Sequence, residues 1–195
     1  MSTKDTTSKP VTQVTTGLVR LSYANIWKAT SIEEGADKKF SSALLIPKTD
    51  EATMEKIEAA IEHLKAEAIK KYGVKGKLPV KFKLPLRDGD EEKPEDEAYA
   101  GHWFINASSK NQPGIVGMER DGDGKLKRIT DESDVKSGDY VRASINFYIF
   151  DVPSQKGIAV GLNNIQKVRD GAPLAGKSNA DADFDDDFED DGFEM

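Results

Sequence analysis

Aromatic and basic side chains alternate with apolar ones along residues 137–152, SGDYVRASINFYIFDV. A strand sends successive side chains to opposite faces, so one face carries the apolar set and the other carries Tyr140, Arg142, Tyr148 and Phe150. Exposed aromatic rings are unfavourable in water unless they are covered or used for binding. This face therefore predicts a surface that stacks planar rings and neutralises anions. In the alternative interpretation, a loop or the helix covers Tyr148.

The next segment, KGIAVGLNNIQKVR, predicts a strand with small residues on its outward face. These residues are Gly157, Ala159, Gly161 and Asn163. A strand with so little outward side-chain volume lets another molecule approach its backbone. Placed beside the aromatic strand, it would form a shelf next to the stacking rings.

The chain offers no pattern for covalent or metal chemistry. It has no cysteine, and neither His63 nor His102 has an evident serine or acid partner. The DGDG turn at 121–124 begins like a calcium loop, but Lys125 stands where a third oxygen ligand belongs. We therefore expect no enzyme activity, no cofactor and no metal.

One segment matches the sequence of a nucleotide-binding motif but lacks the structural context that the motif needs. GAPLAGKS, at 171–178, fits the P-loop pattern, but a P-loop needs a following helix whose N-terminus holds phosphate. The next residues are NADADFDDD, which predict no helix. We interpret the motif as a linker into the acidic segment at the C-terminal end.

That segment, residues 181–195, has nine acidic residues and no basic one. Subtracting the nine leaves 26 acidic residues against 28 basic ones in the rest of the chain, so a slightly basic body is tethered to a polyanion. Like-charge repulsion and low hydrophobicity predict a disordered tail. It could occupy a nucleic-acid groove, bind a basic partner through Phe184, Phe188 and Phe193, or simply aid solubility.

The elements that would position these groups are mostly strands. Alternation predicts strands at 17–29, 38–48 and 102–109, with Val19, Leu21 and Tyr23 expected on one face of the first. The irregular stretch 73–98 contains a basic segment, KGKLPVKFKLPLR, around Phe82.

Residues 50–72 predict one amphipathic helix, because apolar residues recur every three or four positions. The stripe consists of Met54, Ile57, Ile61, Leu64 and Ala68. Thr49 or Asp50 can cap the start, and Gly73 suits a left-handed end. No stretch is apolar enough to span a membrane, and the first residues lack a signal-peptide core, which predicts a cytoplasmic protein.

Five or six strands with one intervening helix predict a mainly β, OB-fold-like barrel. In FSSALLIPK (40–48), SGDYVRASINFYIFD (137–151) and KGIAVGLNNIQKVRDGAPL (156–174), the chain resembles the single-stranded-DNA-binding proteins of tailed phages and prophages. The resemblance implies an OB-fold domain, which we place over 17–170, and the Ser/Thr/Lys-rich composition of residues 1–16 predicts a flexible arm before it. Residues 171–195 are then a linker and an acidic tail that contacts replication or recombination proteins and competes with DNA.

On this interpretation the protein coats single-stranded DNA in the host cytoplasm without sequence preference. Arg20, Lys38, Lys39 and Arg142 would neutralise phosphate. Tyr140, Tyr148, Phe150 and Phe104 would stack on bases. Two alternatives remain open: an acidic-tailed interaction or assembly factor, and a strand-annealing protein.

Overall fold

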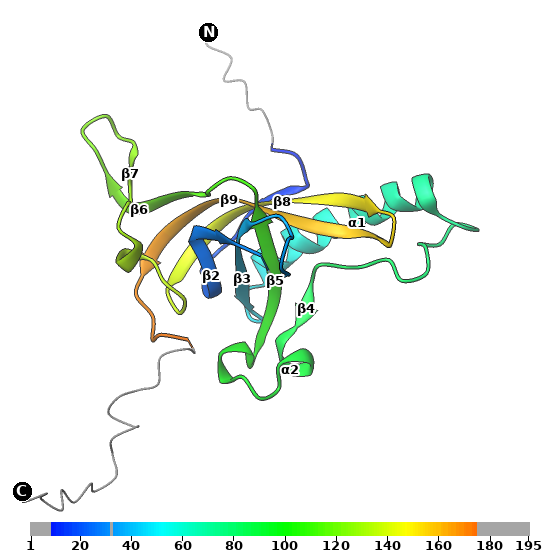
Figure 1. Cartoon of the computed structure of the whole chain (residues 1–195), viewed down its shortest axis with the longest axis horizontal. Coiled ribbons are helices and arrows are strands. Elements are labelled where there is room, and N and C mark those ends of the chain that lie inside the picture. Colours follow the sequence, from blue (N-terminus) through cyan, green and yellow to red (C-terminus); the bar gives the residue numbers. More distant parts are fainter. Residues whose placement is uncertain (1–8, 32, 175–195) are drawn as a thin grey trace, which may run out of the picture.

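The computed structural model describes residues 9–31 and 33–174, a mainly β structure with one long helix (Figure 1). Its strands are β1 (Gln13–Thr15), β2 (Val19–Thr30), β3 (Lys39–Pro47), β4 (Arg87–Asp88), β5 (His102–Ser109), β6 (Gly114–Arg120), β7 (Leu126–Arg128), β8 (Tyr140–Val152) and β9 (Gln155–Arg169). Its helices are α1 (Glu51–Tyr72) and the single-turn α2 (Gly89–Glu92), with 3-10 turns η1 (Glu97–Tyr99) and η2 (Glu132–Asp134).

Five of the described strands close into a ring. Hydrogen-bonded neighbours follow the order β8, β2, β3, β5, β9, and β9 pairs back onto β8. The pairings are antiparallel except between β5 and β9. This arrangement confirms the predicted mainly β, OB-fold-like architecture. β1, β4 and the β6–β7 hairpin extend the ring, so the described part has nine strands where five or six were expected.

The long β8–β9 hairpin supplies much of the core. Its inward residues are almost fully buried, as the alternation predicts: Val141, Ala143, Ile145, Phe147, Ile158, Val160 and Leu162. The two strands pair from Tyr140 opposite Arg169 to Val152 opposite Gln155. The outward side chains of β8 therefore lie on one continuous strip along the hairpin.

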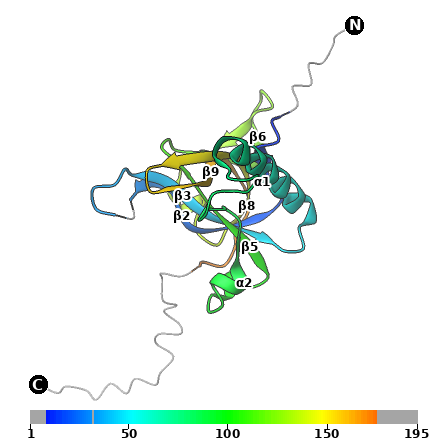
Figure 2. The same cartoon turned by 90° about the vertical axis from the view of Figure 1, so that its right-hand side faces the viewer.

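The predicted helix is confirmed as α1, which lies against the ring (Figure 2). All five residues of its predicted stripe are buried against the strands. The Asp50 side chain caps the start by accepting a hydrogen bond from the Thr53 backbone N–H. Gly73 ends the helix in an extended conformation (φ −68°, ψ 148°), so the left-handed end expected there is wrong.

β2 changes phase halfway along its length. Val19 and Leu21 are fully buried, so the predicted common face would place Tyr23 beside them in the core. Tyr23 is instead 62% exposed. Beyond it Ile26 is fully buried and Asn25 is not, so the inward positions change from odd to even numbers.

A β-bulge causes this change of phase. Ser22 pairs with Ala43, whereas Asn25 pairs with Ser41, so β2 has one residue more than β3 over this interval. The extra residue puts Tyr23 in the left-handed region with φ 48°. The prediction for Tyr23 is wrong because simple alternation cannot count through a bulge.

The N-terminal boundary also differs from the expectation. Gln13–Thr15 fall within the predicted flexible arm, yet they form β1, pair with β8 and bury Val14 in the core. Residues 1–8 of that arm and the acidic residues 181–195 lie outside the described residues. Among the helices that the structure describes, none is both long and apolar enough to cross a bilayer.

Candidate nucleic-acid interface

A groove of about 840 Å³ lies over the outer face of β2, β3 and β5. Its walls come from the connection between β2 and β3 and from the segment that runs from β4 to η1. The groove is lined by Tyr23, Asn25, Thr30, Ser31, Glu33, Ala36, Asp37, Lys39, Ser41, Ser42, Ala43, Arg87, Lys93, Tyr99, Phe104, Asn106, Ala107 and Ser108. Its volume falls in the range of ordinary ligand sites.

Tyr23 is the most exposed aromatic side chain in this groove. The bulge holds its backbone in the left-handed region, which non-glycine residues seldom adopt and which often marks functional positions. The ring is therefore available to stack on a ligand. Sequence reasoning missed it, because the signal that exposes it is an extra residue relative to β3 and not a pattern in β2.

The floor of the groove consists of short polar side chains. Asn25, Ser41, Asn106 and Ser108 come from three adjacent strands, and Ser41 pairs directly with Ser108. These short side chains provide hydrogen-bond donors and acceptors without filling the hollow. A planar ligand stacked on Tyr23 could therefore also hydrogen-bond to the floor.

Basic side chains reach the groove from two sides. Lys39, one of the residues predicted to neutralise phosphate, begins β3 at one wall, while Arg87 and Lys93 come from the opposite segment. The Arg87 guanidinium also pairs with Glu92. Lys38 is exposed next to Lys39 but does not line the groove.

Phe104 is not available for base stacking. It is 2% exposed, and Tyr99 packs edge-on against it with ring centroids 5.1 Å apart. The Arg87 guanidinium lies 4.8 Å from the Phe104 centroid on β5. Together with Leu45, these rings form a second apolar cluster beneath the groove wall. Phe104 therefore cannot stack on a base as expected, because the segment before β5 covers its ring. It instead packs in the apolar cluster that supports the groove wall.

Arg20 and Tyr140 are engaged with the protein itself. Arg20 donates hydrogen bonds from Nε to the Gly138 carbonyl (3.0 Å) and from Nη2 to the Ala172 carbonyl (2.7 Å). Its guanidinium lies 5.5 Å from the Tyr140 centroid, and that of Arg169 lies 4.6 Å from it. Tyr140 thus has two guanidinium neighbours, and Arg20 holds the start of the C-terminal linker.

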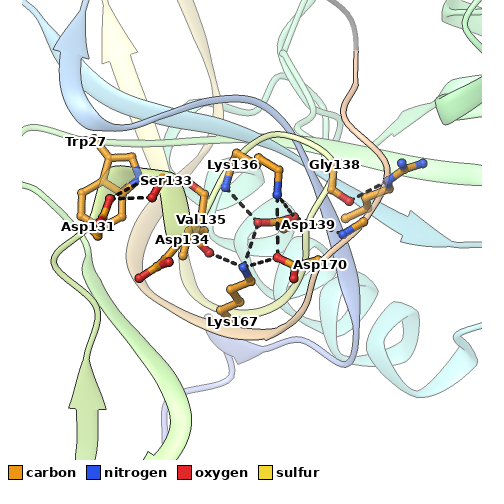
Figure 3. A network of polar contacts seen from close by, with 12 residues as sticks. Trp27, Asp131, Ser133, Asp134, Val135, Lys136, Gly138, Asp139, Lys167 and Asp170 are labelled. Carbon is orange, nitrogen blue, oxygen red and sulfur yellow. Dashed lines mark hydrogen bonds and ion pairs between the residues drawn. The ribbon is translucent and has the colours of Figure 1, made fainter. Parts of the chain in front are cut away.

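A buried carboxylate fastens the same linker (Figure 3). The Asp139 side chain is fully buried and accepts hydrogen bonds from the Gly171 N–H, the Lys136 N–H and the Lys136 ammonium, each at 3.0–3.1 Å. The Lys167 ammonium lies 3.3 Å away. Burial alone would raise the pKa of Asp139, but these hydrogen bonds outweigh it and lower the pKa.

This carboxylate predicts a pH-dependent stability. With its pKa lowered on folding, Asp139 stabilises the native state above its unfolded pKa near 4, and this stabilisation is lost as pH falls through the lower folded pKa. Asp139→Asn replaces charged hydrogen bonds with neutral ones, so we expect a loss of about 1 kcal/mol at pH 7. Urea unfolding of both proteins at pH 7 and pH 3 should show the difference shrinking at pH 3. A difference that is equal at both pH values would contradict the assignment, and Glu58→Gln on the exposed face of α1 is the control.

The remaining predicted residues lie along the outer strip of β8. Arg142 is exposed, with Nε donating to the Thr16 carbonyl at 3.3 Å. Tyr148 is 41% exposed, so no loop or helix covers it completely. Phe150 is half-buried, beside Gly157. Tyr140 and Tyr148 are eight residues apart, roughly 26 Å along a strand, so the predicted platform is two separate sites.

The described residues offer no metal site. Within 9–31 and 33–174, no three histidine, aspartate or glutamate side chains are grouped to hold an ion. His63 is exposed on α1, where its Nε2 lies 3.4 Å from Glu67. Residues 175–178 of the GAPLAGKS motif are outside the described part.

Comparisons with known proteins agree with this architecture. A family model built on the single-stranded-DNA-binding protein of Enterobacter phage Enc34 matches residues 12–194. Putative protein p50 of Acyrthosiphon pisum secondary endosymbiont phage 1 is 31% identical over 179 residues, which cover 86% of this chain and 90% of p50.

Two solved structures share the fold. The single-stranded-DNA-binding protein of bacteriophage Enc34, in complex with single-stranded DNA, has a TM-score of 0.71 at 24% identity, over 84% of this chain and 90% of that one. Bacteriophage T7 gp2.5, also a single-stranded-DNA-binding protein, has a TM-score of 0.58 at 15% identity, over 94% and 98%. Because the family match spans nearly the whole chain, the chain belongs to the family of the Enc34 phage single-stranded-DNA-binding protein.

Proposed function

We propose that this protein binds single-stranded DNA without sequence preference, in the replication or recombination of phage DNA. The observation that carries the proposal is the exposed Tyr23 ring in a groove with a polar floor and with Lys39, Arg87 and Lys93 on its walls. Its membership of the Enc34 family and the likeness to a structure solved with single-stranded DNA support it.

The groove suits a single strand for two physical reasons. Stacking on an aromatic ring accepts every base, because each base has a π face, and it contributes about 1–3 kcal/mol per base. Lys39, Arg87 and Lys93 supply positive charge for the phosphates on either side. In a duplex the base faces are already stacked inside the helix, so Tyr23 gives an advantage only to unpaired bases.

The chain leaves the described part at the wall of this groove. Leu174 packs on the cluster of Leu45, Tyr99 and Phe104, and the two aromatic residues of that cluster also line the groove. Arg20 and Asp139 fix Ala172 and Gly171 just before this point, and the acidic residues 181–195 follow it in the sequence. We propose that they compete there with DNA and recruit replication or recombination proteins, with Phe184, Phe188 and Phe193 as apolar anchors.

Titration of labelled oligo-dT and of a duplex of equal length, at two salt concentrations, tests the proposal. We expect oligo-dT to bind more tightly than the duplex and its affinity to fall as salt rises. Equal affinity for both, or no binding to either, would overturn the function and favour an acidic-tailed assembly factor. Faster duplex formation from two complementary strands would identify a strand-annealing protein.

A further inference from the structure

The segment after α1 concentrates positive charge at one end of the molecule. We call residues 73–84 the lysine loop. It carries four exposed lysines, and two more precede it at the end of α1: Lys70, Lys71, Lys75, Lys77, Lys81 and Lys83. Residues 70–84 contain no acidic residue. In the part of the chain that the structure describes, none of the six lysines forms an ion pair.

The lysine loop has a defined shape. Lys75 and Gly76 both have positive φ (53° and 74°), and Val74 and Lys77 exchange two backbone hydrogen bonds of 3.1 Å around them, as in a type I′ turn. Lys81 is a third residue with positive φ, at 64°. The lysines are therefore held on a fixed backbone, which lowers the entropy lost when they bind a ligand.

The loop is also fastened to the tip of the β8–β9 hairpin. Lys83 donates its N–H to the Lys156 carbonyl (3.0 Å) and accepts from the Ile158 N–H (2.9 Å). Gly157 between them leaves no room for a side chain, since a Cβ there would lie 2.5 Å from the Lys83 carbonyl oxygen. The small residue expected to admit a ligand here instead admits the protein's own loop. Figure 1 shows the end of α1, the loop and the hairpin tip at the same end of the molecule.

This end also has stacking and apolar surface. Phe150 pairs with Gly157, and Tyr148 follows two positions along the same face of β8, about 7 Å away. Tyr148 is 41% exposed, and Val80 on the loop is 92% exposed. Non-specific single-strand surfaces combine exposed aromatic rings with a basic surface, and this end of the molecule has both.

A row of small residues on the outer face of β9 connects the groove with the lysine loop. Ser108 in the groove floor pairs with Gly161 of β9, and Ala159 and Gly157 follow on the same face. The five residues from Gly157 to Gly161 span about 13 Å, and their outward positions are Gly157, Ala159 and Gly161. The Asn146 amide of β8 lies over Gly161 and is the polar side chain that a strand would meet on this path. A chain that leaves the groove across β9 reaches the loop within that distance.

We propose that the lysine loop and Tyr148 form a second contact surface for the same DNA strand, beyond the groove. This inference rests on the proposed single-strand function. The loop neutralises the phosphates of the strand that has left the groove, while Tyr148 stacks on one of its bases. Short strands therefore use the groove alone, and longer strands use both surfaces.

Oligo-dT of two lengths tests this division, because single-strand sites on related folds cover about 4–16 nucleotides. The full chain is titrated with oligo-dT of about five and about sixteen nucleotides, over a range of salt concentrations. The test variant is Lys75→Gln/Lys77→Gln/Lys81→Gln. The control, with the same change in charge, is Lys56→Gln/Lys125→Gln/Lys127→Gln on α1 and the β6–β7 hairpin.

We expect the lysine-loop variant to bind the short oligonucleotide like the unmodified protein and the long one on the order of tenfold more weakly. Its slope of log affinity against log salt should fall by about two, because three phosphate contacts contribute roughly 0.7 each. The control should bind both lengths unchanged. Tyr148→Ala should likewise lose about fivefold or more on the long oligonucleotide only, and Tyr148→Phe should not.

Unchanged long-strand affinity in the lysine-loop variant would overturn the inference, and so would equal losses in the variant and the control. The inference also fails if the variant instead loses self-association in sedimentation, since the loop would then bind the acidic tail of a second copy. Failure of the unmodified protein to bind either oligonucleotide would instead overturn the proposed function.

Discussion

Replacing Tyr23 with asparagine is expected to weaken oligo-dT binding by about 1–3 kcal/mol, roughly five- to 150-fold, without unfolding the protein. The substitution removes the only strongly exposed aromatic ring among the described residues that line the groove. Asparagine is chosen because it tolerates the left-handed backbone that the bulge imposes at this position. Fluorescence anisotropy with labelled oligo-dT measures the affinity, and urea unfolding checks the fold.

Tyr23→Phe is the matched control, since it keeps the ring and removes only the hydroxyl. We expect its affinity to stay within about twofold of the unmodified protein. If Tyr23→Asn binds as tightly as the phenylalanine variant, the groove is not where bases stack. Weakening in both variants would assign the contribution to the hydroxyl group and not to the ring.

Deleting residues 181–195 is expected to raise the affinity for oligo-dT by about tenfold or more at low salt. A tethered segment has an effective concentration of order millimolar, so even weak contacts between its nine acidic residues and the groove are well populated. DNA must displace these contacts before it binds. The gain should shrink as salt rises, because both sets of contacts are screened.

Two full-length variants distinguish the effect of the acidic residues of the tail from the effect of its three phenylalanines. Changing the nine acidic residues to asparagine or glutamine should reproduce the gain in affinity. Changing Phe184, Phe188 and Phe193 to alanine should leave most of the competition in place and abolish the recruitment of partner proteins. Equal affinities of the full-length and truncated proteins at low salt would rule out competition.

The regular elements could be predicted because their burial follows a simple period. β8 and α1 keep one phase, and their inward residues from Val141 to Phe147 and from Met54 to Ala68 are buried as expected. β9 keeps its phase only from Ile158 to Leu162, because an extra residue opposite Ser144 and Ile145 then brings Ile165 into the core. The closure of the five strands could also be predicted, from the number of strands and helices and from the resemblance to a family with an OB-fold. Lys39 was correctly expected at the start of a strand, and the structure places it on the groove wall.

The groove itself could not be predicted, because it depends on contacts between distant segments. Phe104 has the alternation of an outward residue, but the ring of Tyr99, whose hydroxyl group hydrogen-bonds to Ser22 of β2, covers it. Arg20 lies on the outward face of its strand and was expected to bind phosphate, but its guanidinium donates a hydrogen bond to the Ala172 carbonyl of the linker. Neither partner adjoins the residue in sequence, so no local pattern contains this information.

The bulge in β2 also constrains how the chain can vary by insertion and deletion. Losing one residue between Ser22 and Asn25 would remove the extra residue, so β2 would pair with β3 without a bulge at this place. Asn25 would still pair with Ser41 and face the groove, and Ile26 would still face the core in phase with Val19 and Leu21. The single residue left between Ser22 and Asn25 would face the core, so the exposed ring of Tyr23 depends on the extra residue. Alignments of relatives with a one-residue gap here should therefore keep the downstream pattern of polar and apolar positions and lack an exposed aromatic residue at this place.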